Sequence, residues 1–259
     1  MMYVRPKKKL GQHFLIDKNI AEKIVNSLLA TEVEKVIEIG PGTGVLTSFL
    51  IKRENLDVTY IEVDTESVAY LKREFPTIKE KIVEGDFLDV DLAKLLTKKT
   101  AIIGNFPYNI SSQIFFKVLK FRENIPEVVC MIQKEVAERI ATKPGSKKYG
   151  ILSVLLQAFY DIEYLFTVNE QVFNPPPKVK SAVIRFTRNK RESLGCDEAL
   201  FISLVKMAFN QRRKMLSNAL GSLNFENKQD IKYMPMRAEQ LSVDEFIELT
   251  NLVVVKENN

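Results

Sequence analysis

The sequence predicts an α/β fold in which a doubly wound, Rossmann-like sheet is followed by a small C-terminal helical domain. Short apolar segments of strand length alternate with helical segments up to residue 188. Within residues 36–50, a strand runs directly into a glycine-rich turn and a helix. A polar linker, residues 188–195, then precedes a region of helical periodicity. We therefore expect two domains, residues 1–188 and 189–259.

The composition is that of a folded, globular chain. Of 259 residues, 46% are hydrophobic and 27% are charged, and 38 Lys and Arg against 33 Asp and Glu give a net charge of +5. This excess permits a polyanionic partner but does not establish one. Cys130 lies in an apolar segment and Cys196 at the end of the linker region, so we expect no disulfide framework, no metal site and a reducing, cytoplasmic location. Because no apolar segment approaches the length of a membrane span, we expect neither secretion nor membrane insertion.

The chain opens with basic residues, Arg5 and Lys7 to Lys9, followed by the segment Leu10 to Leu15. A basic end of this kind is usually solvated. The glycine and the aromatic residue in the following segment indicate instead an ordered stretch that could close over a ligand. Asp17 is placed to cap a helix that we expect to run to about Ala30.

A glycine turn follows the first strand of the predicted sheet, residues 36–39. Gly40, Gly42 and Gly44 would let the backbone approach a nucleoside closely. Glu62, near the end of the next strand, can accept hydrogen bonds from both hydroxyls of a ribose. Val45 stands where a dinucleotide-binding fingerprint has its third glycine, which argues against a pyrophosphate ligand. The alternative is a turn that only connects a strand to a helix.

Two further strand ends carry residues suited to a nucleoside. After residues 81–83, Asp86 can accept a hydrogen bond from an adenine amino group and Phe87 can pack near the ring. The next strand, residues 101–103, leads to Asn105. Because ligands of doubly wound sheets bind at the carboxyl ends of the strands, these positions should converge. A nucleoside that carries a methylsulfonium group fits this lining, so we expect S-adenosylmethionine as a methyl donor.

The segment Gly104 to Tyr108 has the properties of a methyl-acceptor site. An exocyclic amine of a nucleobase is a poor nucleophile because its lone pair is delocalised, so a catalyst must hold the nitrogen with hydrogen-bond acceptors. Asn105 offers its side-chain carbonyl, and Phe106 offers a backbone carbonyl whose direction is restricted by Pro107. Tyr108 offers a face on which a base can stack. The alternative is an ordinary turn at the end of a strand.

The remaining elements follow from periodicity. Between the last two strands, three successive prolines hold an extended segment that could fix Phe173 opposite Tyr108, as the second face of a clamp around the base. The alternative is a rigid connector with Phe173 in the core. We expect further strands at residues 128–132, 162–168 and 179–186, and helices at residues 111–119, 133–140, 151–160, 201–209 and 241–255.

Two basic clusters are candidates for contacts with phosphates. The first lies in a loop, residues 143–150, that has glycines but no periodic pattern. The second follows the helix at residues 201–209, where adjacent arginines suit bidentate binding of phosphate. Each cluster could also be a solvated surface. The candidate residues are Lys147, Lys148, Arg212, Arg213 and Lys214.

Taken together, these motifs resemble those of the KsgA-type small-subunit ribosomal RNA adenine dimethyltransferases over nearly the whole chain. The matching segments, in the order of the family, are KLGQHFL (9–15), EIGPGTG (38–44), GNFPYN (104–109), KYG (148–150), FNPPPKV (173–179) and FNQRRK (209–214). The resemblance implies a Rossmann-like methyltransferase sheet. It also implies transfer of two methyl groups from S-adenosylmethionine to N6 of each of two adjacent adenines near the 3′ end of the small-subunit RNA.

The resemblance also implies roles for single residues. The chain departs from the family pattern at His13, where Asn is more usual, and at Phe106, where Leu is commoner. The second departure should matter little, because the backbone carbonyl is the expected actor. The positions that match the donor-binding residues of the family are His13, Leu15, Gly40, Glu62, Asp86 and Asn105, and the spacing argument adds Gly42 and Phe87.

We therefore expect a cytoplasmic dimethyltransferase with a role in ribosome biogenesis, acting as a monomer on the small ribosomal subunit and its rRNA. The nearest alternative is a large-subunit adenine methyltransferase of the antibiotic-resistance type. Two further alternatives are a ribosome-assembly factor whose methylation is incidental and a DNA adenine methyltransferase.

Overall fold

The computed structural model describes residues 4–97 and 99–254, which divide into two compact units. The first unit consists of the chain up to residue 137 together with residues 161–188, and the second of residues 138–160 and the chain from residue 189. The predicted boundary at residue 188 coincides with one of the points at which the chain passes from one unit to the other. Residues 138–160 differ from the prediction, because helix α6 (Ile151–Gln157) packs against α7 (Glu198–Asn210) and α9 (Val243–Asn251) of the second unit.

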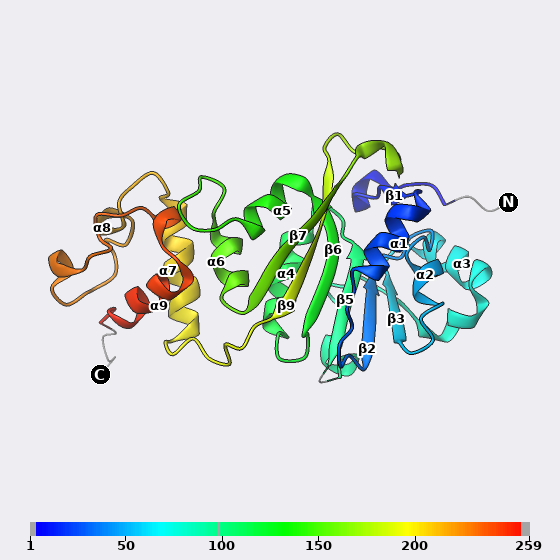
Figure 1. Cartoon of the computed structure of the whole chain (residues 1–259), viewed down its shortest axis with the longest axis horizontal. Coiled ribbons are helices and arrows are strands. Elements are labelled where there is room, and N and C mark those ends of the chain that lie inside the picture. Colours follow the sequence, from blue (N-terminus) through cyan, green and yellow to red (C-terminus); the bar gives the residue numbers. More distant parts are fainter. Residues whose placement is uncertain (1–3, 98, 255–259) are drawn as a thin grey trace. The chain divides into compact units, whose positions relative to one another are not determined.

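A sheet of mostly parallel strands forms the first unit (Figure 1), and its order among the described residues is β4-β3-β2-β5-β6-β9-β7. Neighbouring strands from β4 to β6 pair in parallel, and β9 runs antiparallel to β6. This arrangement confirms the predicted α/β fold. The strands are β2 (Lys35–Ile39), β3 (Asp57–Glu62), β4 (Ile82–Glu84), β5 (Thr100–Asn105), β6 (Glu127–Gln133), β7 (Tyr160–Val168) and β9 (Ser181–Arg188).

The strand order reverses between β2 and β5. From β2 the chain continues outward to β3 and β4, and from β5 it continues in the opposite direction to β6. Sheets of this kind bind ligands outside the carboxyl ends of the strands at such a reversal. The register pairs Ile39 with both Ile61 and Gly104, so the residues that follow β2, β3 and β5 meet at one edge.

The central strands have continuous apolar sequences because both of their faces are covered. Ala101, Ile102 and Ile103 of β5 are each 0% exposed, as are Val128 and Val129 of β6. A parallel strand that is buried on both faces requires such a run rather than alternation of apolar and polar residues. This is why these strands could be predicted from the sequence.

Helices connect the strands of the first unit. Helix α5 begins in this unit and ends in the second. A small antiparallel sheet, β1 (Phe14–Leu15) with β8 (Phe173–Asn174), ties the beginning of the chain to the segment before β9. The helices are α1 (Lys18–Asn26), α2 (Thr47–Leu50), α3 (Thr65–Glu74), α4 (Ser111–Lys120) and α5 (Lys134–Ala141), with short 3-10 helices η1 (Lys8–Leu10), η2 (Pro76–Lys81), η3 (Leu92–Lys94) and η4 (Glu170–Val172).

Helix α1 starts as predicted but ends early. Asp17 accepts hydrogen bonds from the backbone N–H groups of Asn19 and Ile20, as expected of a helix cap. The helix stops at Asn26 rather than at Ala30. The cause is Glu127, whose carboxylate accepts the N–H groups of residues 29 and 30 at 2.8 Å each and so draws the chain out of the helix.

The second unit packs its helices around aromatic residues. Phe209 of α7 lies 6.2 Å from the ring of Tyr149 and 6.0 Å from the ring of Phe246, measured between centroids. Helix α6 is shorter than predicted because strand β7 begins at Tyr160, and α9 ends at Asn251, while Val255 of the predicted helix lies outside the described residues. The unit also contains α8 (Leu216–Ala219), η5 (Lys228–Asp230) and η6 (Ala238–Gln240). Among all helices of the described ranges, none is long and apolar enough to cross a membrane.

The glycine turn provides a matched pair of substitutions. Gly40 and Gly44 both have a left-handed backbone, with φ of +65° and +79°. A Cβ on Gly44 would lie 2.3 Å from the Phe75 ring, whereas at Gly40 the nearest atom is 4.0 Å away. We expect Gly40→Ala to lower the free energy of unfolding by about 1–2 kcal/mol, the cost of the left-handed conformation. Gly44→Ala should cost about 1–3 kcal/mol more, because of overlap with the ring.

Urea denaturation of the two variants beside the parent protein measures this difference. Equal destabilisation by the two substitutions would contradict the steric role of Phe75.

Candidate active site

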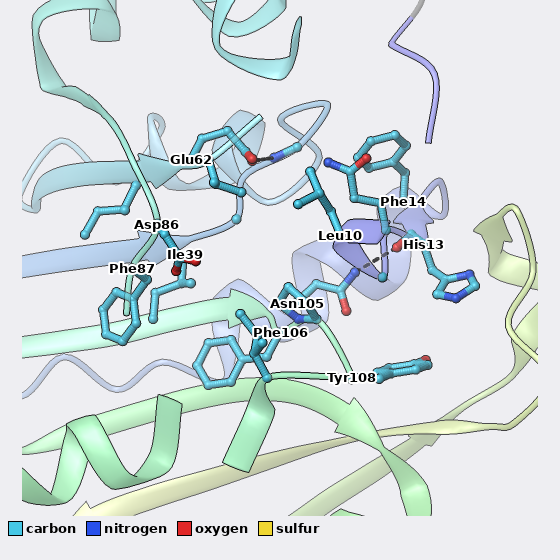
Figure 2. Close-up of a pocket in the computed structure, with 18 of the residues that line it drawn as sticks. Leu10, His13, Phe14, Ile39, Glu62, Asp86, Phe87, Asn105, Phe106 and Tyr108 are labelled. Atoms are coloured by element: carbon cyan, nitrogen blue, oxygen red, sulfur yellow. Dashed lines mark hydrogen bonds between the residues drawn. The ribbon is translucent and has the colours of Figure 1, made fainter. Parts of the chain in front are cut away.

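A cavity opens at the carboxyl ends of β2, β3 and β5 in the first unit (Figure 2). Together with the solvent at its open mouth, it encloses about 680 Å³ of space. The structure brings most of the residues singled out in the sequence together around this cavity. They are His13, Gly40, Gly42, Glu62, Asp86, Phe87, Asn105, Phe106, Pro107 and Tyr108.

Glu62 and the glycine turn form one wall of the cavity. The N–H of Gly42 donates to one carboxylate oxygen of Glu62 and the N–H of Asp64 donates to the other, both at 2.9 Å. Glu62 is 3% exposed, and burial raises its pKa although these two hydrogen bonds oppose the shift. The carboxylate is thus fixed in orientation, and each of its oxygens keeps a lone pair for another donor. Side-chain space is also limited here, because a Cβ on Gly42 would lie 2.8 Å from the Phe14 ring.

The loop after β4 forms the adjoining wall. One carboxylate oxygen of Asp86 accepts from the N–H of Leu88 at 2.8 Å, and the Asp86 backbone oxygen accepts from the N–H groups of Asp89 and Val90. Phe87 is 3% exposed and contributes an apolar face to the cavity. A carboxylate with a fixed rotamer therefore stands beside a flat apolar ring.

Asn105 stands at the end of β5, opposite the N-terminal segment. Its side-chain nitrogen donates to the backbone oxygen of His13 at 3.0 Å. Because a carbonyl oxygen can only accept, this contact decides which end of the amide is the nitrogen. The carboxamide oxygen consequently points the other way, toward the side of the cavity on which Tyr108 lies (Figure 2).

The residues after Asn105 are anchored in the core and at the sheet. The ring of Phe106 is 1% exposed and packs against Phe115, with centroids 6.0 Å apart, and its N–H donates to Met131 O at 3.0 Å. The Tyr108 hydroxyl forms a hydrogen bond with Ser181 Oγ at 2.5 Å, and burial raises the pKa of Tyr108. These contacts hold the Asn105–Tyr108 segment in one conformation.

Tyr108 stacks on His13 rather than on Phe173. The rings of His13 and Tyr108 lie 5.6 Å apart at an interplanar angle of 26°. His13 Nδ1 is 2.8 Å from the backbone oxygen of Pro175, so this nitrogen carries the proton. Phe173 is 3% exposed and lies in the core, because its pairing with Leu15 across β1 and β8 turns the ring inward. The expected position of Phe173 opposite Tyr108 is therefore wrong, and the structure matches the alternative of a core phenylalanine.

A smaller cavity shares Phe14, Gly40 and Asn105 with the main one and is also lined by Leu15 and Glu38. Leu15 does not line the main cavity: its side chain is 4% exposed and belongs to the core. Glu38 is 1% exposed and accepts a hydrogen bond from the Thr47 hydroxyl at 2.8 Å. Burial raises the pKa of Glu38 to about 8, against the hydrogen bond from Thr47.

The sequence analysis did not single out Glu38 as a buried carboxyl group beside the site. The sequence did contain a signal, because Glu38 is an acidic residue inside the otherwise apolar end of β2. Acidic side chains are rarely buried unless they have a specific partner.

The N-terminal segment is tied down by contacts that the sequence did not predict. Lys7 pairs with the buried carboxylate of Asp64 and lies 3.1 Å from Glu66. Gln12 reaches the other oxygen of Asp64 at 3.4 Å. Burial alone would raise the pKa of Asp64, but hydrogen bonds, led by the one from Lys7, hold it below its ordinary value. Lys7 is thus an anchor, and residues 10–14 form a wall of the cavity.

In the second unit, Arg212 is committed to the basic loop. Its guanidinium donates to the backbone oxygens of Ser146, at 3.5 Å, and of Lys147. It also lies 3.7 Å from the carboxylate of Glu239, whose backbone oxygen accepts from the N–H of Gly145 at 2.7 Å. Arg212 therefore holds the loop at residues 143–150 against the C-terminal segment of the same unit.

The other predicted basic residues differ in what they contact. Lys148 is exposed and pairs with Glu138 at 2.5 Å. Lys147, Arg213 and Lys214 are exposed. The two basic clusters, which are far apart in the sequence, thus lie side by side where Arg212 meets the loop.

The two cysteines lie away from the main cavity. Cys130 is buried in β6, where burial raises its pKa, and Cys196 is partly buried before α7. Among residues 4–97 and 99–254, no group of three or more His, Cys, Asp or Glu side chains is arranged to hold a metal ion.

Comparisons with known proteins agree on one family. The profile of the family described as ribosomal RNA adenine dimethylase matches residues 4–254. Ribosomal RNA small subunit methyltransferase A of Cytophaga hutchinsonii is 58% identical over 255 residues, which cover 98% of this chain and 99% of that protein. The protein of the same name from Parabacteroides distasonis is 56% identical over 252 residues, which cover 96% of this chain and 94% of that protein.

Solved structures show the same architecture. A dimethyladenosine transferase from Plasmodium falciparum superposes with a TM-score of 0.76 at 25% identity, covering 93% of this chain and 99% of that one. The 23S rRNA methyltransferase ErmE superposes with a TM-score of 0.70 at 22% identity, with the same coverage of 93% and 99%. At that identity the second likeness shows the fold alone.

The buried Glu38 predicts a pH dependence of stability. Its pKa is about 8 in the folded protein, against 4.5 ordinarily. Between these values the unfolded chain gives up a proton that the folded protein keeps, so the free energy of unfolding falls as pH rises, by up to about 1.4 kcal/mol per pH unit. Glu38→Gln keeps an acceptor for Thr47 and removes this titration. We expect the variant to gain stability relative to the parent protein between pH 5 and pH 8.

Urea denaturation of both proteins at the two pH values tests this, with the difference between them as the readout. A change in the free energy of unfolding with pH that both proteins share comes from other groups. Glu62 is one of them, since burial raises its pKa as well. Parallel curves for the two proteins would show that Glu38 does not titrate in this range.

Proposed function

The chain belongs to the ribosomal RNA adenine dimethylase family, and we propose that it transfers methyl groups from S-adenosylmethionine to N6 of two adjacent adenines near the 3′ end of small-subunit ribosomal RNA. Relatives that match nearly end to end carry the name of small-subunit methyltransferases, which favours this RNA over that of the large subunit. The observation that carries the proposal is the orientation of Asn105, whose amide nitrogen is bound to His13 while its oxygen is left for a substrate.

The strand ends fit S-adenosylmethionine. Glu62 presents two fixed carboxylate oxygens that suit the hydroxyls of a ribose. Asp86 presents a carboxylate that suits an adenine amino group, and Phe87 an apolar face for the ring. When bound, the donor supplies a methyl group on a positively charged sulfur. The resemblance adds contacts from His13, Leu15, Gly40 and Gly42.

The acceptor side is built from Asn105 and Phe106. The carboxamide oxygen of Asn105 and the backbone oxygen of Phe106 are acceptors for the protons of an adenine amine. As the nitrogen attacks, its lone pair leaves conjugation and its N–H groups become more acidic, so fixed acceptors stabilise the transition state more than the ground state. The proton leaves after the methyl bond has formed, and no strong general base is required. Positioning of this kind can lower the barrier by about 7–11 kcal/mol.

Tyr108 offers the target base a face, which the His13 ring covers in the structure. An adenine that enters the acceptor site takes the place of His13 against Tyr108, and Pro107 keeps the chain extended at this point. Stacking of a base on an aromatic ring contributes about 1–3 kcal/mol, which offsets the displacement of a single imidazole. Phe173 supports the site from the core.

The second unit supplies an RNA-binding surface. Lys147, Arg213 and Lys214 are exposed beside the junction at which Arg212 holds the basic loop. Their charges suit RNA phosphates, and Lys148 extends the same surface. The partner that follows from this reading is the small ribosomal subunit with its rRNA, bound by a monomer in the cytoplasm during ribosome biogenesis.

Mass spectrometry of ribosomal RNA tests the function directly. Purified small subunits incubated with the protein and S-adenosylmethionine should gain methyl groups on adjacent adenines near the 3′ end. Asn105→Ala should lower kcat by about 10²–10³-fold, as for the loss of one transition-state hydrogen bond elsewhere, and change the donor Kd little. In parallel incubations with large subunits or with duplex DNA, methylation of those substrates and not of the small subunit would support one of the rival enzymes.

Assembly measurements with the same variant separate catalysis from binding. Full rescue of subunit assembly by the inactive Asn105→Ala protein would make assembly the dominant role. Loss of donor affinity with unchanged kcat would remove Asn105 from the acceptor site.

Arg212 and Arg213 make a further matched pair. Arg213→Ala should reduce the slope of log affinity against log salt for RNA by about 0.7–0.9, the value of one lost phosphate contact. Arg213→Lys should retain the slope. Arg212→Lys should weaken RNA binding although it keeps the charge, because a lysine does not reproduce the guanidinium contacts that hold the loop. Filter-binding titrations over a range of salt concentrations measure both effects. An unaltered slope in Arg213→Ala would show that Arg213 does not contact an RNA phosphate.

A further inference from the structure

Lys117 reaches from helix α4 to the loop that carries Asp86 and Phe87. Its ammonium nitrogen donates to the backbone oxygens of Phe87, Leu88 and Val90 at 2.7, 2.8 and 2.7 Å. An ammonium group has three hydrogens, so these acceptors use its full donor capacity. A single charge therefore binds the carbonyl groups of residues 87, 88 and 90.

The same loop turns its N–H groups inward to Asp86. The N–H of Leu88 donates to the carboxylate of Asp86, and the N–H groups of Asp89 and Val90 donate to its backbone oxygen. The carbonyl groups on the other side of the loop point toward one another and would repel without a cation between them. Lys117 and Asp86 thus stabilise opposite sides of one loop, and the rotamer of Asp86 depends on both.

The surroundings of Lys117 favour a fixed position over a mobile one. Burial lowers the pKa of Lys117, while the carboxylates of Asp89 and Asp86 oppose that shift. The ammonium also lies 5.3 Å from the centroid of the Phe87 ring, within range of a cation–π contact. Lys117 therefore contacts the ring of Phe87 as well as the backbone that places Asp86.

We propose that Lys117 is a positioning residue for the adenine ring of the donor: by holding the carbonyl groups of residues 87, 88 and 90, it sets where Asp86 and Phe87 meet that ring. The inference rests on the proposed function, because it assumes that the cavity binds S-adenosylmethionine. It goes beyond that function by assigning the selectivity for the adenine base to a residue that does not line the cavity.

Titration calorimetry with two ligands tests this role. S-adenosylhomocysteine carries the adenine amino group, and S-inosylhomocysteine carries an oxygen in its place, which would face the carboxylate of Asp86. Wild-type protein should prefer the first ligand about tenfold or more, the worth of a hydrogen bond to a charged group. Lys117→Met should lose most of this preference by weakening the first ligand and leaving the second nearly unchanged. Lys120→Ala, which removes a lysine from the same helix, should keep the wild-type preference.

The ratio of the two affinities distinguishes positioning from general damage, since misfolding would weaken both ligands alike. If Lys117→Met does not fold, Lys117→Arg supplies the measurement, because a planar guanidinium cannot converge on the three carbonyl groups as an ammonium does. A wild-type ratio in the variant that folds overturns the role of Lys117 alone. Wild-type protein that binds neither ligand overturns the proposed function, and this inference with it.

Discussion

The hydrogen bond from the Asn105 amide to the His13 carbonyl is the contact on which the site depends. It joins the end of β5 to the N-terminal segment, and it turns the carboxamide oxygen toward the side of the cavity on which Tyr108 lies. An amide is a useful group for this purpose because it donates at one end and accepts at the other. A carboxylate at this position could not donate to the carbonyl, and a hydroxyl would leave its orientation open. The orientation of the Asn105 side chain therefore follows from the placement of a segment that lies far away in the sequence.

The walls formed by Glu62 and Asp86 follow a different principle, in which carboxylates are held by backbone N–H groups. Glu62 is fixed by Gly42 and Asp64, and Asp86 by Leu88. Such groups are costly to bury, and burial raises the pKa of both Glu62 and its neighbour Glu38. A ligand with hydroxyl groups and a positive charge relieves part of that cost. The fold thus keeps a destabilised, preorganised edge for the molecule that binds there.

What the sequence predicts depends on how local the responsible contacts are. The parallel sheet, the glycine turn and the position of Asn105 are encoded by consecutive residues, and they were predicted. The β1–β8 pairing and the ion pair of Lys7 with Asp64 join segments that are distant in the sequence, and no local sequence pattern predicts them. The predicted position of Phe173 was wrong for the same reason. Prolines keep a segment extended, but they do not determine whether a neighbouring aromatic side chain points toward the core or toward the cavity. The roles of the site residues stay predictions.

The N-terminal wall of the cavity has a consequence for the synthesis of the chain. Residues 10–14 are synthesised well before Pro175, so the His13 ring can find its partner there only after the intervening strands of the sheet have been made. The nascent chain must therefore carry the His13 ring without this partner while the sheet assembles behind it.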